Sequence, residues 1–248
     1  MRFINQCLLS YLFLFIISSG FVSAQYSYDF EVGVVKTGYN KVRIPGNTGT
    51  FVSLSHELKQ STTNYLRIFS TYNLNSRSSI SILIAPLKLN YTGELSRDVF
   101  FYNQNFAQGA SVTSTYKFNS YRVSYSYLIF KKQKFSFSAG LTLKVRDAFI
   151  RLESGSVSST KYDLGVVPLI NFNFTYSPFN RVGFIFYGDA LAAPQGRAED
   201  FFVGLTYSVY DKLGIKAGYR MLEGGADNKT VYTFSLFHYY AIGILFNL

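Results

Sequence analysis

The chain has 248 residues, of which 48% are hydrophobic and 15% charged, and its formal net charge is +10. Its single cysteine, Cys7, lies in an N-terminal segment that we expect to be removed, which excludes disulfides, thiol catalysis and cysteine metal sites in the mature chain. The basic excess, 24 Lys and Arg against 14 Asp and Glu, is not gathered on a helix or in a tail. We therefore expect no nucleic acid partner, and anionic lipid head groups or small anionic solutes fit the charge better.

The N-terminus has the form of a secretory signal peptide. Arg2 precedes the apolar stretch 7–17, and Val22-Ser23-Ala24 places small residues where signal peptidase cuts. We expect residues 1–24 to be a signal peptide and residues 25–248 to be a transmembrane β-barrel domain, for the reasons that follow.

A retained anchor helix is the alternative reading of this segment. The apolar run would reach the length of a membrane span only if it continued to Val22, and Ser18-Ser19-Gly20 interrupts it. Removal of the segment takes away Arg2 as its only charge, which changes the net charge from +10 to +9.

After residue 25, apolar and polar residues alternate in segment after segment, most clearly in 135–146. A strand turns successive side chains to opposite faces, so each segment has one apolar and one polar face. No later apolar run is long enough for a membrane helix, and strands that cross a membrane must close into a barrel. The pattern predicts about twelve antiparallel strands, at 26–38, 50–58, 64–73, 78–88, 96–106, 110–130, 134–151, 160–176, 180–191, 199–209, 213–223 and 230–248.

The connections between these strands predict which end faces the periplasm. Short polar connections are expected there and longer ones outside. The predicted periplasmic turns are Gln60–Thr63, Lys131–Lys134, Ser177–Asn180 and Tyr210–Lys212, and the predicted outer loops are Tyr39–Gly49, Glu153–Ser159, Ala192–Arg197 and Gly224–Lys229. An even strand number then requires an ascending strand at 96–106, which has the weakest pattern, and a barrel of ten strands is the fallback.

Two places disturb the alternation. Pro168 lies inside a strong strand pattern, and because a closed barrel has no free edge we expect a bulge there. The apolar phase also slips between Phe118 and Tyr121, which predicts a bulge near Asn119-Ser120 or a tight hairpin.

A soluble β-sandwich would also alternate, but its outer faces carry many charges. Charged residues make up 15% of this chain, against about 25% in typical soluble domains. A barrel in the bacterial outer membrane is therefore preferred. Its register places Leu141, Leu143, Ile170, Phe172, Phe184 and Phe186 toward lipid, and Lys144, Asn171 and Ile185 toward the lumen.

The polar phase of the strands collects charged residues, which we expect to line the lumen. With Asp29 and Glu31, they are Arg67, Arg122, Lys144, Arg146, Asp163, Asp189, Asp200, Lys216 and Arg220. Because acids and bases are interleaved, they are expected to pair and fill a narrow barrel. The alternative is a charged constriction that selects solutes.

Catalytic patterns are sparse in the mature chain. Its two histidines, His56 and His238, fall in the apolar, outward phase, with His56 expected low in a descending strand. Ser235 is three residues from His238 and on the opposite face, so the two are badly placed as a nucleophile and its base. We predict no catalytic residues, cofactor or metal, and the sequence has no glycine-rich phosphate loop.

The aromatic C-terminal strand, Tyr240-Ala241-Ile242-Gly243-Ile244-Leu245-Phe246-Asn247-Leu248, completes the pattern. Together with the signal and the strands it resembles bacterial outer-membrane β-barrel proteins, and in size the small twelve-stranded monomeric channels for acidic sugars. The resemblance implies a monomer among outer-membrane lipids that serves as a structural barrel or a small-solute channel with a mild anion preference. An outer-membrane lipid-modifying hydrolase of deacylase or phospholipase type is the alternative, although the catalytic pattern of those enzymes is not found here.

Overall fold

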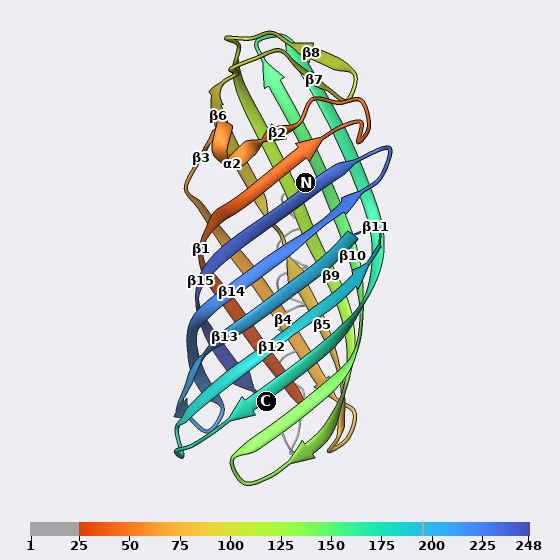
Figure 1. Cartoon of the computed structure of the whole chain (residues 1–248). Coiled ribbons are helices and arrows are strands. Elements are labelled where there is room, and N and C mark those ends of the chain that lie inside the picture. The colour runs from red at the N-terminus through yellow and green to blue at the C-terminus, as the bar shows by residue number, and fades with distance from the viewer. Residues whose placement is uncertain (1–24, 195) are drawn as a thin grey trace, which may run out of the picture.

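The computed structural model describes residues 25–194 and 196–248, and the predicted signal peptide lies outside them. Ten antiparallel strands form a closed barrel (Figure 1), which confirms the predicted fold class. The ring closes where β9 pairs with β10 and where β1 pairs with β15. The ten strands are β1 (Tyr26–Arg43), β4 (Thr63–Asn73), β5 (Ser78–Ala85), β9 (Ser111–Lys131), β10 (Phe135–Ser154), β11 (Val157–Tyr176), β12 (Val182–Ala193), β13 (Gly196–Tyr210), β14 (Leu213–Asp227) and β15 (Tyr232–Asn247).

The expectation of about twelve strands is only roughly matched, and the fallback of ten fits the barrel. Segment 50–58 forms β2 (Val52–Ser53) and the short helix α2 (Leu54–Glu57). Segment 96–106 forms a separate hairpin of β7 (Val99–Phe101) and β8 (Gln104–Phe106). Val52 and Leu54 of the first segment and Val99 and Phe101 of the second are buried inside the protein instead of facing lipid. Alternation alone does not distinguish these two fates.

Because these two segments are not barrel strands, the predicted directions of the strands between them were wrong. Strands β4 and β5 run opposite to the directions expected for them, and 74–77 is a short turn at the end where β1 begins and β15 ends. Gln60–Thr63, expected at the periplasmic end, lies at the outer end beside β6 (Lys88–Glu94). The turns predicted around 131–134, 177–180 and 210–212 join strands at the periplasmic end as expected. The chain has two barrel strands fewer than predicted before β9. Because this difference is even, β9 and all later strands run in the predicted directions.

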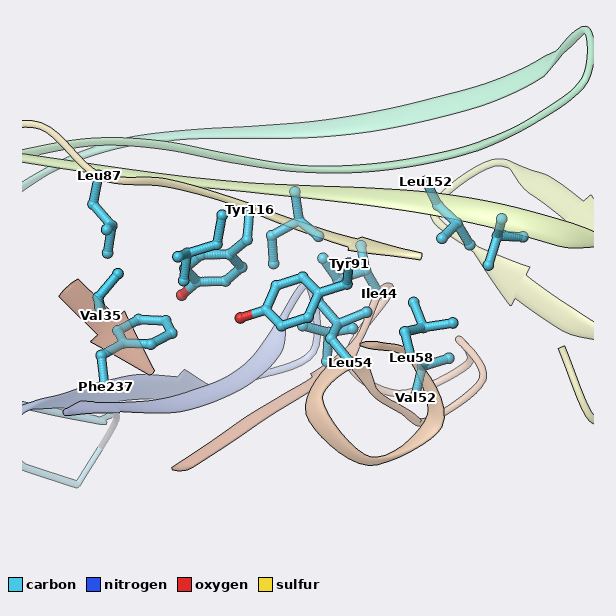
Figure 2. Packing of buried hydrophobic residues seen from close by; sticks show 14 of the residues in the cluster. Val35, Ile44, Val52, Leu54, Leu58, Leu87, Tyr91, Tyr116, Leu152 and Phe237 are labelled. Atoms are coloured by element: carbon cyan, nitrogen blue, oxygen red, sulfur yellow. The ribbon is translucent and has the colours of Figure 1, made fainter. Parts of the chain in front are cut away.

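The long outer connections fold into a lobe at the top of Figure 1, which we call the outer lobe (residues 44–62 and 86–110). It contains α2, β2, β7, β8, β3 (Lys59–Gln60) and β6 (Lys88–Glu94), with β6 paired to β9 and β3 to β6. Figure 2 shows its apolar side chains packing inward against Tyr116 and Phe237 of the barrel. The lumen is therefore filled by a hydrophobic cluster at its outer end.

This cluster explains the apparent slip of phase in β9. Tyr116 and Phe118 point into the barrel, while Tyr121 and Val123 are exposed outside, and the pairing with β10 continues through Asn119 without a shift. The expected bulge or hairpin at Asn119-Ser120 is therefore absent from the described β9. Apolar residues change faces because the interior is polar beside the membrane and apolar beneath the outer lobe.

The register of the wall is as predicted. Leu141, Leu143 and Ile170 are among the most exposed large apolar side chains, and Lys144 and Asn171 are buried inside. Ile185 packs against the interior cluster, as its inward phase required. A belt of exposed apolar residues around a barrel with a filled interior is the surface of a protein embedded in a bilayer. None of the described helices is long and apolar enough to cross a membrane.

Pro168 causes no bulge, because β10 and β11 pair without a register shift through Leu143 and Pro168. The pairing of β11 with β12 begins only at Ile170. Pro168 therefore lies where the second edge of β11 has no strand partner among the described residues. A proline is tolerated at such an edge.

Candidate functional site: a charged network across the lumen

Eight charged side chains from six strands meet inside the barrel and form one network, which we call the lumen network. All eight were predicted to point into the lumen. Its members are Asp29, Glu31, Arg67, Arg122, Asp189, Asp200, Lys216 and Arg220. Their inward direction follows from strand alternation. The curvature of the barrel brings strands far apart in sequence within reach of one another.

Asp200 of β13 is one centre of this network. Its carboxylate accepts hydrogen bonds from Arg67 at 2.7 Å, from Arg122 at 2.6 Å and from Arg220 at 2.6 Å. These arginines come from β4, β9 and β14, so the contacts cross the lumen. A buried carboxylate is stable when its charge is balanced and its oxygens accept hydrogen bonds.

Glu31 is the second centre. Arg220 donates to both of its oxygens, from Nε at 2.8 Å and from Nη2 at 2.9 Å, in the two-pronged geometry that suits a guanidinium. Lys216 donates to Glu31 at 2.7 Å and to Asp29 at 2.6 Å. Tyr65 and Tyr187 donate further hydrogen bonds to Glu31. The Glu31 carboxylate thus accepts hydrogen bonds from four side chains.

Asp189 extends the network toward β10 and β11. It accepts from Arg122 at 2.5 Å and from Thr142 at 2.5 Å, and Thr142 in turn accepts from Asn171 at 3.2 Å. Uncharged polar side chains of the lumen phase thus extend the hydrogen bonding. Thr142 and Tyr187 point inward by strand alternation, but nothing in the sequence pattern marks them as partners of these charges.

The three other predicted lumen charges lie outside the network, toward the outer end. Arg146 and Asp163 pair with each other at 2.5 Å, and both are partly exposed. Lys144 is only 2% exposed, and its Nζ lies 4.7 Å from the centre of the Phe118 ring. No carboxylate of the described residues lies within 4.0 Å of this ammonium. Lys144 is therefore a buried cation without an ionic partner in the described part of the chain.

Two cavities border the network. The first, the outer cavity, has a volume of about 120 Å³ and lies between the network and the outer lobe, with Lys144 and Phe118 in its wall. The second, the lower cavity, has about 260 Å³ and is lined by Asp29, Asp189 and polar residues near the periplasmic end. The network thus separates two internal spaces.

The histidines are not arranged for catalysis. His238 faces outward and contacts the hydroxyl of Tyr219 at 2.5 Å through Nδ1, while Ser235 is buried inside and lies 3.1 Å from the Tyr116 hydroxyl. The two occupy opposite faces of β15, as predicted. His56 lies in α2 of the outer lobe and not low in a lipid-facing strand, because 50–58 is not a barrel strand. Within residues 25–194 and 196–248, no group of three or more His, Cys, Asp and Glu residues is placed to hold a metal ion.

Comparison with known proteins supports the fold and leaves the activity open. No protein-family model and no curated protein sequence matches the chain. Among solved structures it is similar to the outer membrane protease OmpT from Escherichia coli, with a TM-score of 0.54 and 9% identity over 94% of this chain and 99% of that one. The translocator domain of the autotransporter NalP from Neisseria meningitidis (TM-score 0.47, 7% identity, 100% of this chain and 97% of that one) is a more distant match. So is the toluene transporter TodX from Pseudomonas putida (0.37, 8%, 90% and 90%).

At these identities the likeness concerns the fold alone. The fold is that of the bacterial outer-membrane β-barrels, and the belt of exposed apolar side chains agrees with it. The protein is accordingly placed in the bacterial outer membrane.

Proposed function

We propose that this protein is a structural outer-membrane barrel with a closed lumen, and that it does not serve as an open channel. The observation that carries the proposal is the lumen network, in which four carboxylates and four cations from six strands bind one another across the barrel. Above it, the hydrophobic cluster of the outer lobe fills the outer end. Both features stabilise a narrow barrel and oppose the passage of solutes.

The channel with a mild anion preference has less support. Such a preference requires cations that are free to meet a passing anion. In the lumen network every cation contacts a carboxylate, and the network carries no net charge. Lys144, which lies outside the network, has no carboxylate partner among the described residues. It is a single cation in the wall of the outer cavity and does not form a ring around a path for ions. We further propose that the barrel is a monomer surrounded by outer-membrane lipids.

The lipid-modifying hydrolase also has less support. A nucleophile and its base must lie within hydrogen-bond reach of each other, and Ser235 and His238 occupy opposite faces of the wall. Release of fatty acid from outer-membrane lipids that is lost in His238→Ala would reverse this ranking.

Swelling of proteoliposomes tests the proposal. Vesicles containing the folded protein are transferred into isotonic solutions of a small neutral sugar or of an anionic sugar acid. We expect no swelling beyond that of protein-free vesicles with either solute. Swelling that is faster with the anionic solute would instead support the channel with an anion preference. The shift of electrophoretic mobility on heating verifies that the inserted protein is folded.

A further inference from the structure

The barrel wall is interrupted on one side. Strand β11 pairs with β10 along its whole length, from Val157 to Tyr176. On its other edge it pairs with β12 only from Ile170 to Tyr176. In the described part of the chain, residues 157–169 therefore have no strand partner on that edge. The ends of the β12–β13 and β14–β15 hairpins lie across this interruption (Figure 1).

The interruption reaches the apolar belt. Leu164 and Val166 are 77% and 62% exposed and point outward from this part of β11. Unpaired backbone N–H and C=O groups are costly in the hydrocarbon core of a membrane, so open sheet edges are not left facing lipid chains. Pro168 has no N–H, but the other residues that turn an N–H to this edge keep theirs. An apolar chain that lies along this edge would shield it from lipid.

The outer cavity lies directly behind the interruption. Val167 and Asp163 of β11 form one side of it, and Ala198 of β13 with Gly224 and Ala226 of β14 form the other. Small residues on the second side leave space where larger side chains would fill the cavity. Residues from both sides of the interruption thus line one cavity of about 120 Å³.

The chemistry of this cavity has two parts. Tyr116, Phe118, Leu222 and Phe237 make much of its wall apolar. Lys144, at its base, is buried without an ionic partner among the described residues. Arg146, which pairs with Asp163 at 2.5 Å, lies on the same face two residues further along β10, and Glu223 also lies in the wall. A buried ammonium is costly unless an anion compensates it. The cavity therefore suits a ligand with an anionic head and an apolar chain.

We propose that the outer cavity binds a single-chain anionic amphiphile that enters sideways from the outer leaflet through the interruption between β11 and the β12–β13 hairpin. Its head group binds Lys144 and Arg146, and its chain leaves through the interruption, where it covers the unpaired edge of β11. The head group is a carboxylate or a phosphate, both of which these two cations accept. This site goes beyond the closed-barrel proposal and does not depend on it, because it lies on the outer side of the lumen network.

Photocrosslinking in proteoliposomes tests the proposal. The probe is a C12 fatty acid that carries a diazirine, and labelled peptides are mapped by mass spectrometry. We expect labels on residues 144–150 and 222–237, and competition by unlabelled dodecanoate. Competition by dodecyl phosphate as well would show that any anionic head is accepted, and its failure would assign the site to carboxylates. A dodecanol probe should label these peptides about tenfold less, because a charged hydrogen bond is lost.

Two variants and one control make the test specific. Lys144→Gln should weaken labelling by about tenfold or more, since the anion loses its charged partner. Ala148→Phe adds volume to the wall of the cavity and should reduce labelling while Lys144 is retained. Lys132→Gln, in an exposed periplasmic turn, should leave labelling unchanged. Each variant is first shown to be folded by its heat-modifiable mobility.

Labels spread evenly over the lipid-facing belt, or labelling that is equal in wild type and Lys144→Gln, would overturn the site. Equal labelling by dodecanol and the fatty acid would overturn the anionic head group. Conductance through the barrel would overturn the closed lumen without affecting either result, so the two proposals fail separately.

Discussion

Asp189 and Asp200 are direct register partners on β12 and β13, and both carboxylates bind the guanidinium of Arg122. Nη1 of Arg122 lies 2.5 Å from Asp189 and Nη2 lies 2.6 Å from Asp200. Two neighbouring carboxylates in a buried site repel each other, and the arginine between them offsets this repulsion.

Arg122→Gln should therefore be strongly destabilising. The substitution leaves Asp189 without its ionic partner, and an uncompensated buried charge costs about 3–5 kcal/mol. The free energy of unfolding, measured by urea titration of the protein in lipid vesicles, checks this value. Lys117→Gln is the matched control, because Lys117 pairs with Asp147 at a partly exposed site and should cost no more than about 1 kcal/mol. Equal losses in the two variants would contradict the structural role of the lumen network.

The register of β11 predicts opposite outcomes for two nearby positions. Ile170→Arg places a charge in the lipid belt and should cost about 2–4 kcal/mol. Asn173→Arg places the same side chain in the lower cavity, where water and polar groups solvate it, and should cost far less. The same unfolding titration compares them. Similar costs at both positions would mean that the faces of β11 are wrongly assigned.

The interrupted wall predicts how prolines behave. Pro168→Ala should change the free energy of unfolding by less than about 1 kcal/mol, because Pro168 lies at the edge of the paired region. Val123→Pro should destabilise by about 3 kcal/mol or more, since Val123 is paired on both sides, with Ile82 and Leu143. A large loss in Pro168→Ala would indicate that the proline has a structural role of its own.

The barrel, its membrane-facing register and the inward charges were predictable because a strand has a period of two residues. The strand number was not, because Val52 and Leu54, or Val99 and Phe101, alternate in the same way whether their apolar face meets lipid or a folded lobe. The expected bulge at Pro168 is absent because β11 is not paired along its whole second edge, whereas a fully closed barrel would leave no such edge.

The partners within the lumen could not be predicted from the pattern. Glu31 and Arg220 are 189 residues apart and meet only because closure places β1 near β14, on the far side of β15. Alternation gives the direction of each side chain, but the shear and diameter of the barrel decide which inward residues come into contact. Lys144 has the same inward phase as Arg122, yet it lies outside the network because no carboxylate among the described residues reaches it.

Single-channel recording in planar bilayers tests the closed lumen most directly. The wild-type protein, shown to be folded by its heat-modifiable mobility, is inserted at known density, and the current is recorded under an applied voltage. We predict no discrete current steps above the bare bilayer, because the lumen network and the outer lobe both cross the path of an ion. Regular steps of constant size, with a reversal potential that shows anion selectivity in a salt gradient, would contradict the closed lumen.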